Sequence, residues 1–140
     1  MKKIKNLLYF IDDDGLVAIT DCNTSAEGEL VIPNEIEGLP VTSIGDNAFC
    51  GCSRLTLINI PDSITSIGSW AFDMCSSLTS ITIPEGVTSI GGGAFNRCTS
   101  LTSINIPDSI TSIGRWAFEG CSSLTSITIG TQTKRTLKQK

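Results

Sequence analysis

A nine-residue pattern that returns every 23 residues constrains this chain more than any other feature. The pattern occupies Ile60–Gly68, Ile83–Gly91 and Ile106–Gly114, and each copy is followed by an Ala-Phe pair, a Cys and a Leu at fixed spacings. An earlier copy and a last partial copy extend the repeat over residues 32 to 130. A period in the twenties is too short for a pair of helices and is typical of one coil of a repeat solenoid.

Each copy predicts two short strands and one compact turn. Apolar and polar residues alternate in the second half of Leu78–Ile83, as in a strand with one buried face. Pro84 ends that strand because it has no N–H to donate. Ile64–Ile67 predicts a second extended segment, and Ala71-Phe72 predicts a single helical or 3₁₀ turn. Coils stacked at ~4.8 Å would align their Ile, Phe, Cys and Leu side chains in ladders.

The predicted fold is a β-rich repeat solenoid in a single domain with an N-terminal β cap. The segment Pro33–Gly45 is five residues longer than its equivalent Pro61–Gly68, which indicates a hairpin-like insertion before the regular coils. We therefore assign residues 1–40 to a cap with β-hairpin character and 41–130 to the 23-residue repeats. Residues 131–140 form a basic tail that we expect to be disordered.

Composition excludes several classes of function. The net charge is −4, but the lysines lie at the two ends, and residues 7–130 hold three arginines against all 14 acidic residues. A body this acidic repels phosphate backbones and argues against nucleic-acid binding. The chain has no His, the commonest general base and metal ligand. It also has no nucleophile motif or phosphate-binding glycine loop, so we expect no enzyme, cofactor or metal site.

The N-terminus resembles an export signal only in its first basic residues. The apolar stretch Leu7–Ile11 ends at Asp12 and is shorter than the ~7–15 residues of a signal's apolar core. No apolar run approaches the ~20 residues that a membrane-spanning helix needs. The sequence therefore predicts no signal peptide and no membrane span, and leaves the location of the protein open.

Six cysteines raise the question of disulfides or metal. One cysteine recurs per coil beside the Phe, a position that predicts a ladder of buried free thiols, and this ladder consists of Cys52, Cys75, Cys98 and Cys121. Cys50 instead takes the place of Asp73, so we expect its thiol to face solvent. Cys22 and Cys50 are thus candidates for a disulfide, and Cys50 for an intermolecular contact.

Two sets of residues are candidates for binding. Trp70 and Trp116 share one position two coils apart, which indicates either an exposed aromatic pair on the convex side or packing across the gap left by Gly93. The second set alternates with the buried strand residues and forms a small, polar, nearly uncharged face, of the kind that repeat arrays use for binding: Leu57, Asn59, Ser80, Thr82, Ser103, Asn105, Ser126 and Thr128.

The repeat resembles the BspA-like leucine-rich repeats. The resemblance rests on Leu-x-x-Ile-x-Ile-Pro followed by Ile/Val-x-x-Ile-Gly-x-x-Ala-Phe-x-x-Cys, and the segments Tyr9–Thr20 and Leu30–Val41 look like those that open such arrays. It implies a right-handed leucine-rich-repeat coil without catalytic activity. It also implies the setting of the family, which is common in bacterial surface proteins, often extracellular, that bind host or partner proteins.

Our functional prediction is a non-catalytic, adhesin-like protein-interaction module that binds a partner or host matrix protein through its repeat surface. The alternative is a structural repeat segment that self-associates through its C-terminal end, where the last copy stops at Ile129-Gly130 without an evident cap. A homodimer could form through that C-terminal edge or through Cys50.

Overall fold

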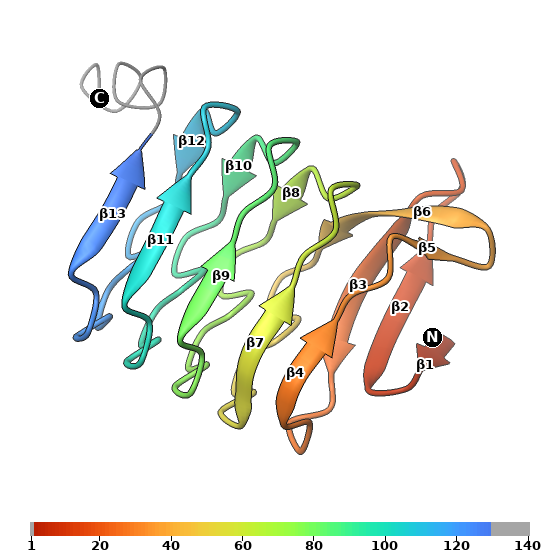
Figure 1. The fold of residues 1–140 in the computed structure, drawn as a ribbon. Coiled ribbons are helices and arrows are strands. Elements are labelled where there is room, and N and C mark those ends of the chain that lie inside the picture. The colour runs from red at the N-terminus through yellow and green to blue at the C-terminus, as the bar shows by residue number, and fades with distance from the viewer. Residues whose placement is uncertain (1, 130–140) are drawn as a thin grey trace.

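The computed structural model describes residues 2–129, and Figure 1 shows them as a β-solenoid with one sheet on each of two sides. Sheet A has the order β1 (Lys2–Ile4), β2 (Leu7–Ile11), β3 (Val17–Cys22), β6 (Leu39–Ile44), β8 (Ser66–Ile67), β10 (Ser89–Ile90) and β12 (Ser112–Ile113), with β5 (Glu35–Ile36) paired to β6. Sheet B has the order β4 (Gly28–Val31), β7 (Leu55–Asn59), β9 (Ser80–Thr82), β11 (Ser103–Ile106) and β13 (Ser126–Ile129). These elements confirm the predicted β-solenoid.

The strand register follows the sequence repeat. In sheet A, Ser89 lies opposite Ser66 on one side and Ser112 on the other. In sheet B, Ile104 pairs with Ile81 and Ile127 in the same way. Equivalent residues of successive coils therefore stack directly on one another, as the 23-residue period predicts.

The core is a set of such stacked ladders between the two sheets. Phe49, Phe72 and Phe95 are fully buried, and neighbouring rings stack with centroids 5.2 Å apart. Phe118 continues the stack with a centroid distance of 5.7 Å from Phe95. Offset stacking at this spacing stabilises aromatic pairs beyond the burial of their surface.

The cysteine ladder lies beside the phenylalanines, as predicted, and all six cysteines of the chain are free thiols. The Sγ of Cys98 donates to the backbone carbonyl of Phe72 across 3.2 Å, and Cys75 bonds Phe49 O at the same distance. Burial raises the pKa of the Cys98 thiol to about 12. Cys52, Cys75 and Cys98 are buried as predicted, whereas Cys121 in the last described coil is only half-buried. The buried thiols thus act as small core residues with a weak hydrogen bond to the preceding coil.

The turn that carries Ala-Phe is not a helix, and no residue from 2 to 129 is helical. Local bonds from each residue to the third before it, as in a 3₁₀ turn, are present at Ala48 and Cys50. The alternate residues Asn47, Phe49 and Gly51 instead donate their N–H groups to carbonyls of the next coil, at 2.7–2.9 Å. Half of the turn's donors therefore join neighbouring coils, which a helix would not allow because its N–H groups bond internally.

This turn needs two residues with left-handed backbone conformation in each coil. In the coil that contains β6 and β7 these are Asn47 (φ 60) and Gly51 (φ 78), four residues apart. The same two positions have positive φ in the next three coils, and they are Trp70, Met74, Gly93, Arg97, Trp116 and Gly120. Asn and Gly adopt this conformation readily, whereas bulky side chains do so at a cost.

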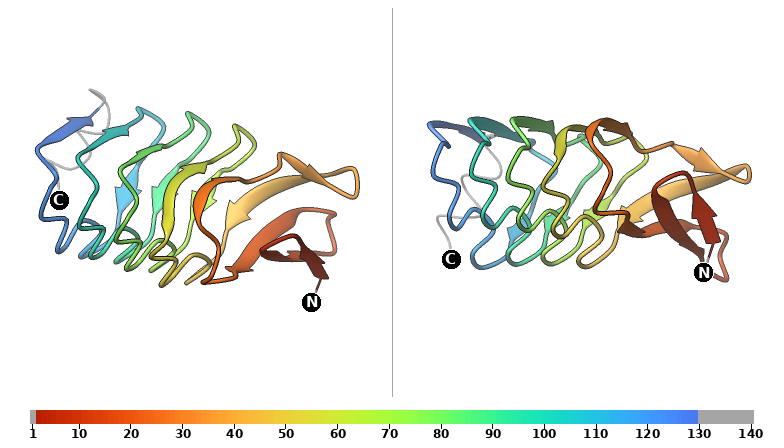
Figure 2. Two further views of the ribbon diagram at one scale, coloured as in Figure 1. Left: turned by 60° about the horizontal axis from the view of Figure 1, so that its bottom comes forward. Right: turned by 90° about the horizontal axis from the view of Figure 1, so that it is seen from below.

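The N-terminal strands extend sheet A in antiparallel fashion. Strands β1, β2 and β3 pair antiparallel, and β3 then pairs in parallel with β6. Figure 2 shows that the β5–β6 hairpin extends past the coils toward the N-terminal strands. Glu37 at its tip accepts hydrogen bonds from Tyr9 Oη at 2.7 Å and from Lys2 Nζ at 2.9 Å. These bonds lower the pKa of Glu37 and fasten the hairpin to β1 and β2.

The first parallel coil begins ahead of residue 41. Strand β3 already lies in sheet A, and β4 already pairs in parallel with β7. The division between cap and repeats at residue 40 stays an interpretation, and the predicted tail at residues 131–140 lies outside the described residues. Within residues 2–129 no helix has the length and apolarity that a bilayer span requires.

Replacing Gly91 with Ala should destabilise the fold strongly. A Cβ at Gly91 would overlap the backbone of Gly68 and Ser69 in the preceding coil. We expect a loss of about 2–3 kcal/mol in the free energy of unfolding, the range of overpacked sites. The adjacent Gly92→Ala is the matched control, because its nearest backbone atom is the Arg115 carbonyl oxygen at 3.3 Å. Equal losses in urea unfolding of the two variants would contradict the close packing of coils.

The buried thiols should make the fold sensitive to alkali. The pKa of Cys98 is about 12 in the folded chain against an ordinary value of 9.0, so its contribution is complete below pH 9 and is lost as the pH rises toward 12. Between pH 8 and 10.5 the unfolding free energy of the unchanged chain should fall because of Cys98. Over the same pH range the fall should be about 2 kcal/mol smaller in the Cys98→Ala variant, which lacks this thiol. Parallel pH profiles of the two proteins would show that Cys98 ionises freely in the folded state.

Candidate functional site

The residues predicted to form a binding face all lie on the outward side of sheet B. Leu57, Ser80, Ser103 and Ser126 occupy one row along the solenoid, and Thr82, Asn105 and Thr128 lie in register in a second. Asn59 begins the second row from β7, and all eight side chains except the half-buried Leu57 are exposed. The structure thus gathers these residues on one face, as the alternation of the strands predicted.

The same face continues onto β4, which the sequence analysis did not include. Glu29 lies beside Leu57, and Val31 lies beside Asn59. The Glu29 carboxylate accepts a hydrogen bond from Asn59 Nδ2 at 3.2 Å, and the Val31 side chain is 62% exposed. The sequence indicated this strand only by the short alternation of polar and apolar residues in Gly28–Ile32. The five-residue insertion that follows separates this alternation from the regular repeat.

Rows of threonine hydroxyls flank the strands and are used within the fold. The Oγ1 atoms of Thr79, Thr102 and Thr125 each bond the carbonyl of the threonine one coil earlier, at 3.3–3.4 Å. A second row at the other sheet repeats this pattern at 3.1–3.3 Å, through Thr65, Thr88 and Thr111. The abundance of threonine therefore serves the contact between coils, which reduces the number of hydroxyls free to bind a ligand.

Trp70 and Trp116 come together across Gly93, in the segments that link sheet A to sheet B. Their ring centroids are 6.4 Å apart with an interplanar angle of 28°. The Trp70 indole covers Gly93 so closely that a Cβ there would overlap the ring. Trp116 remains 58% exposed. Both interpretations of the sequence are thus realised in part, because the rings pack over the glycine and still present an aromatic surface.

Met74 and Arg97 occupy the second left-handed position of these turns. The Met74 side chain is 44% exposed, and with Arg97 it lines an apolar hollow of about 290 Å³ that also involves Gly51 and Ser53. We call Trp70, Met74, Arg97 and Trp116 the turn surface. Met74 and Arg97 were not among the predicted binding residues, although the sequence shows that these larger residues take the place of Gly51 at one position of the repeat.

Cys50 is less accessible than predicted. Its side chain is half-buried, and its Sγ lies 3.7 Å from Oδ2 of Asp73, the equivalent residue in the next coil. The other carboxylate oxygen of Asp73 accepts from Asn96 Nδ2 at 2.9 Å. Burial and the Asp73 carboxylate both raise the pKa of Cys50, which disfavours the reactive thiolate.

Cys22 is buried and does not pair with Cys50. Its backbone carbonyl accepts a long hydrogen bond of 3.9 Å from Cys52 Sγ. Contact with the Cys52 thiol and burial raise the pKa of Cys22. In residues 2–129 no three Cys, Asp or Glu side chains converge as a metal site would require.

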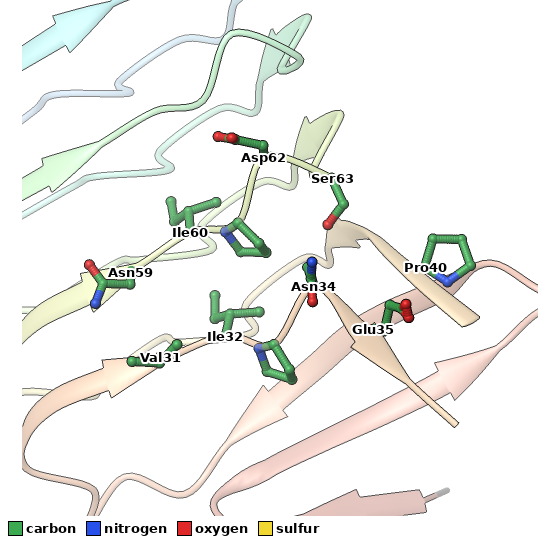
Figure 3. Close-up of a pocket in the computed structure, with 11 residues that line it drawn as sticks. Val31, Ile32, Asn34, Glu35, Pro40, Asn59, Ile60, Asp62 and Ser63 are labelled. Atoms are coloured by element: carbon green, nitrogen blue, oxygen red, sulfur yellow. The ribbon is translucent and has the colours of Figure 1, made fainter. Parts of the chain in front are cut away.

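A further hollow lies beside the β5–β6 hairpin (Figure 3). It has a volume of about 610 Å³, and Ile32 and Pro33 line it on one coil and Ile60 and Pro61 on the next. It exists because the five additional residues leave the stack as a hairpin. In Figure 3 the Asp62 carboxylate is turned away from the hairpin, so it does not converge with Glu35, the other acidic residue that lines the hollow.

Ser63 also lines this hollow, and its buried Oγ has no hydrogen-bond partner. The equivalent Ser109 two coils later has the same unpaired hydroxyl, although it does not line the hollow. The unpaired group is therefore a feature of the repeat and does not indicate a ligand.

Comparison with known proteins agrees with this geometry. A leucine-rich repeat protein from Bacteroides capillosus is 29% identical, with a TM-score of 0.82, and the match covers 92% of this chain and 97% of that one. The T. pallidum leucine-rich repeat protein is 29% identical, with a TM-score of 0.72 and coverage of 90% and 70%. A leucine-rich repeat protein from Bacteroides ovatus is 30% identical with a TM-score of 0.67, and the match covers 91% of this chain but 40% of that one.

No curated protein matches the chain. The pattern described as BspA type leucine-rich repeat region, however, matches residues 26–139 in six copies. That match spans most of the sequence and coincides with the stacked coils. This chain therefore belongs to the BspA-type leucine-rich repeat family.

Proposed function

We propose that this protein is a non-catalytic interaction module that binds a partner protein through the turn surface. The family supports a repeat protein of the kind commonly used in protein interaction. The observation that carries the proposal is the stacked pair Trp70 and Trp116, both in left-handed backbone conformation with φ 59 and 61.

This placement of tryptophan is costly for the fold. The left-handed conformation costs a residue with a side chain roughly 1–2 kcal/mol, and Asn47 and Gly93 show that residues suited to it fill the same position in other coils. The aromatic stack returns about 0.5–1.5 kcal/mol. Because both tryptophans bear this cost, roughly 2–4 kcal/mol together, the single stack does not compensate for it, and stacking alone does not explain the tryptophans.

The composition of the turn surface is that of a protein interface. Trp, Met and Arg are enriched at interfaces, and Trp and Arg dominate binding energy where partners meet. The outward face of sheet B carries none of these residues and only one charge, at Glu29. We therefore assign the turn surface as the anchor of binding, with the rows from Leu57 to Thr128 as a flanking contact.

The adhesin-like role is the finer part of this proposal. The solved relatives include bacterial leucine-rich repeat proteins from Bacteroides and T. pallidum. A host matrix protein is accordingly the partner class that we propose, with fibronectin and fibrinogen as the first probes.

Self-association through the C-terminal end is the second candidate. In the last described coil the Ile127 side chain is 44% exposed, whereas its equivalent Ile104 is 3% exposed. An apolar end of this kind can pair with another chain. Light scattering over a concentration series in reductant distinguishes this candidate, because Ile127→Lys would then convert a dimer to a monomer.

Replacing both tryptophans with asparagine should abolish binding and leave the fold intact. Asn47 shows that the turn accepts Asn in this position. We expect the unfolding free energy of the Trp70→Asn, Trp116→Asn double variant to stay within about 1 kcal/mol of the original, since relief of strain at two positions opposes the loss of the stack and of the Trp70 surface packed over Gly93. The affinity of the double variant for fibronectin or fibrinogen, measured by surface plasmon resonance, should be at least tenfold lower than that of the original chain.

Ser80→Asn is the control, because it changes the sheet B face and leaves the turn surface untouched. Equal binding by the double variant and the original would overturn the assignment of the turn surface. Failure of both matrix proteins to bind the original chain would overturn the adhesin-like role.

A further inference from the structure

The two sheets end unevenly at the N-terminal side of the solenoid. Sheet B ends at β4, whereas sheet A continues past β3, the strand preceding β4 in the same coil, with β2 and β1 (Figure 1). Among residues 2–129 no strand pairs with the outer edge of β4. A step therefore lies beside β4, with the β1–β2 hairpin beyond it.

The backbone of β4 presents unpaired hydrogen-bonding groups to this step. Gly28 and Ile32 donate their N–H groups to Arg54 and Asn59, on the β7 side. Because strand residues alternate, the N–H and C=O groups of Glu29 and Val31 point the other way, toward the open edge. Such an edge is a template for another strand.

Two hollows with apolar residues in their linings follow the same edge. One of about 270 Å³ is lined by Leu7, Ala26, Leu30 and Leu55, and the other of about 220 Å³ by Ile4 and Pro33. Lys5 and Val31 line both hollows, so the two adjoin along β4. The exposed Val31 side chain thus lies where an added strand would run.

The charges beside the edge are mainly acidic. Glu27 and Glu29 line the larger hollow together with Lys5. A segment with a basic residue near these two carboxylates would complement them, and its apolar residues would fill the hollows.

The shape of the step admits a strand and obstructs a coil. Within the described residues, β12 and β13 are the last strands of their sheets on the C-terminal side and belong to the same coil, so that side is level as far as residue 129. A second copy that stacked this level end against β4 would meet β2 and β1, which occupy the next positions of sheet A. The geometry favours a single strand over a further copy of the chain.

We propose that the open edge of β4 is a strand-addition site, which takes one extended, mainly apolar segment of a partner protein with a basic residue next to Glu27 and Glu29. The segment would hydrogen-bond the backbone of Glu29 and Val31. This site is separate from the turn surface and does not depend on the function proposed for it.

A peptide that already forms this kind of sheet is the probe. Leu101–Ile106 includes β11, which pairs on both edges in sheet B. We would synthesise this peptide with one Lys at each end and blocked termini. A second peptide would have the same sequence and would be methylated at alternate backbone nitrogens. Binding of the first peptide to the whole chain, followed by NMR, should slow amide exchange at Glu29 and Val31, and the methylated peptide should not bind.

Two variants at one position isolate the backbone donor. Val31→Pro removes the N–H that faces the open edge, which edge strands tolerate, and should weaken peptide binding roughly tenfold. Val31→Thr keeps the N–H and should bind within about twofold of the original. The Trp70→Asn, Trp116→Asn double variant should bind the peptide as the original does, which separates this site from the turn surface.

Three results would overturn the proposal. One is equal binding of the methylated and unmethylated peptides. This comparison uses the unchanged chain, so it tests the proposal even if Val31→Pro does not fold. Another is unchanged exchange at Glu29 and Val31 when the peptide is bound. The third is a dimer of the unchanged chain that Val31→Pro dissociates, because the occupant would then be a second copy.

Discussion

Backbone hydrogen bonds between equivalent residues of successive coils are the constraint on which the rest of this structure depends. They join the coils at three places, in sheet A, in sheet B and in the turn, where Phe72 N donates to Ala94 O at 2.8 Å. One coil cannot bury its own apolar face, so each depends on the next. The strict 23-residue period, the stacked Phe rings and the buried thiols all follow from this register.

The same constraint decides where the molecule can differ from coil to coil. Any residue beyond the period must leave the stack, as the β5–β6 hairpin does, and it creates the hollow beside Pro33 and Pro61. Side chains inside the stack are nearly invariant between coils. Variation collects at outward positions, where Trp70, Met74, Arg97 and Trp116 replace the Asn or Gly that the left-handed backbone favours. We infer binding from these positions because they are the ones that the fold leaves free.

Much of the fold was predictable because a strand pattern that is too short to be reliable in one copy returns in every copy of the repeat. The alternation in Ser80–Ile83 is brief, but its return 23 residues later indicates parallel stacking and places Ser80 and Ser103 side by side. The same repetition identified the buried thiols of Cys75 and Cys98. The family match over residues 26–139 confirms the resemblance to the BspA-like leucine-rich repeats.

What escaped prediction depends on contacts between coils that a single copy does not reveal. Ala71-Phe72 resembles a helical turn locally, yet the N–H of Phe72 is taken by the next coil. Cys50 was expected in solvent, but Asp73 from the following coil covers it. The open edge of β4 arises because sheet A gains two strands that sheet B lacks, a difference that only the complete topology shows.

Residue-by-residue amide hydrogen exchange of the native chain tests the account most directly. The turn donors Phe49, Phe72 and Phe95 should exchange as slowly as the core strand amides, because each bonds a carbonyl of the next coil at 2.7–2.8 Å. Exchange of these three amides as fast as that of exposed residues would contradict the account. It would mean that the backbone joins the coils only in the two sheets and not in the turn.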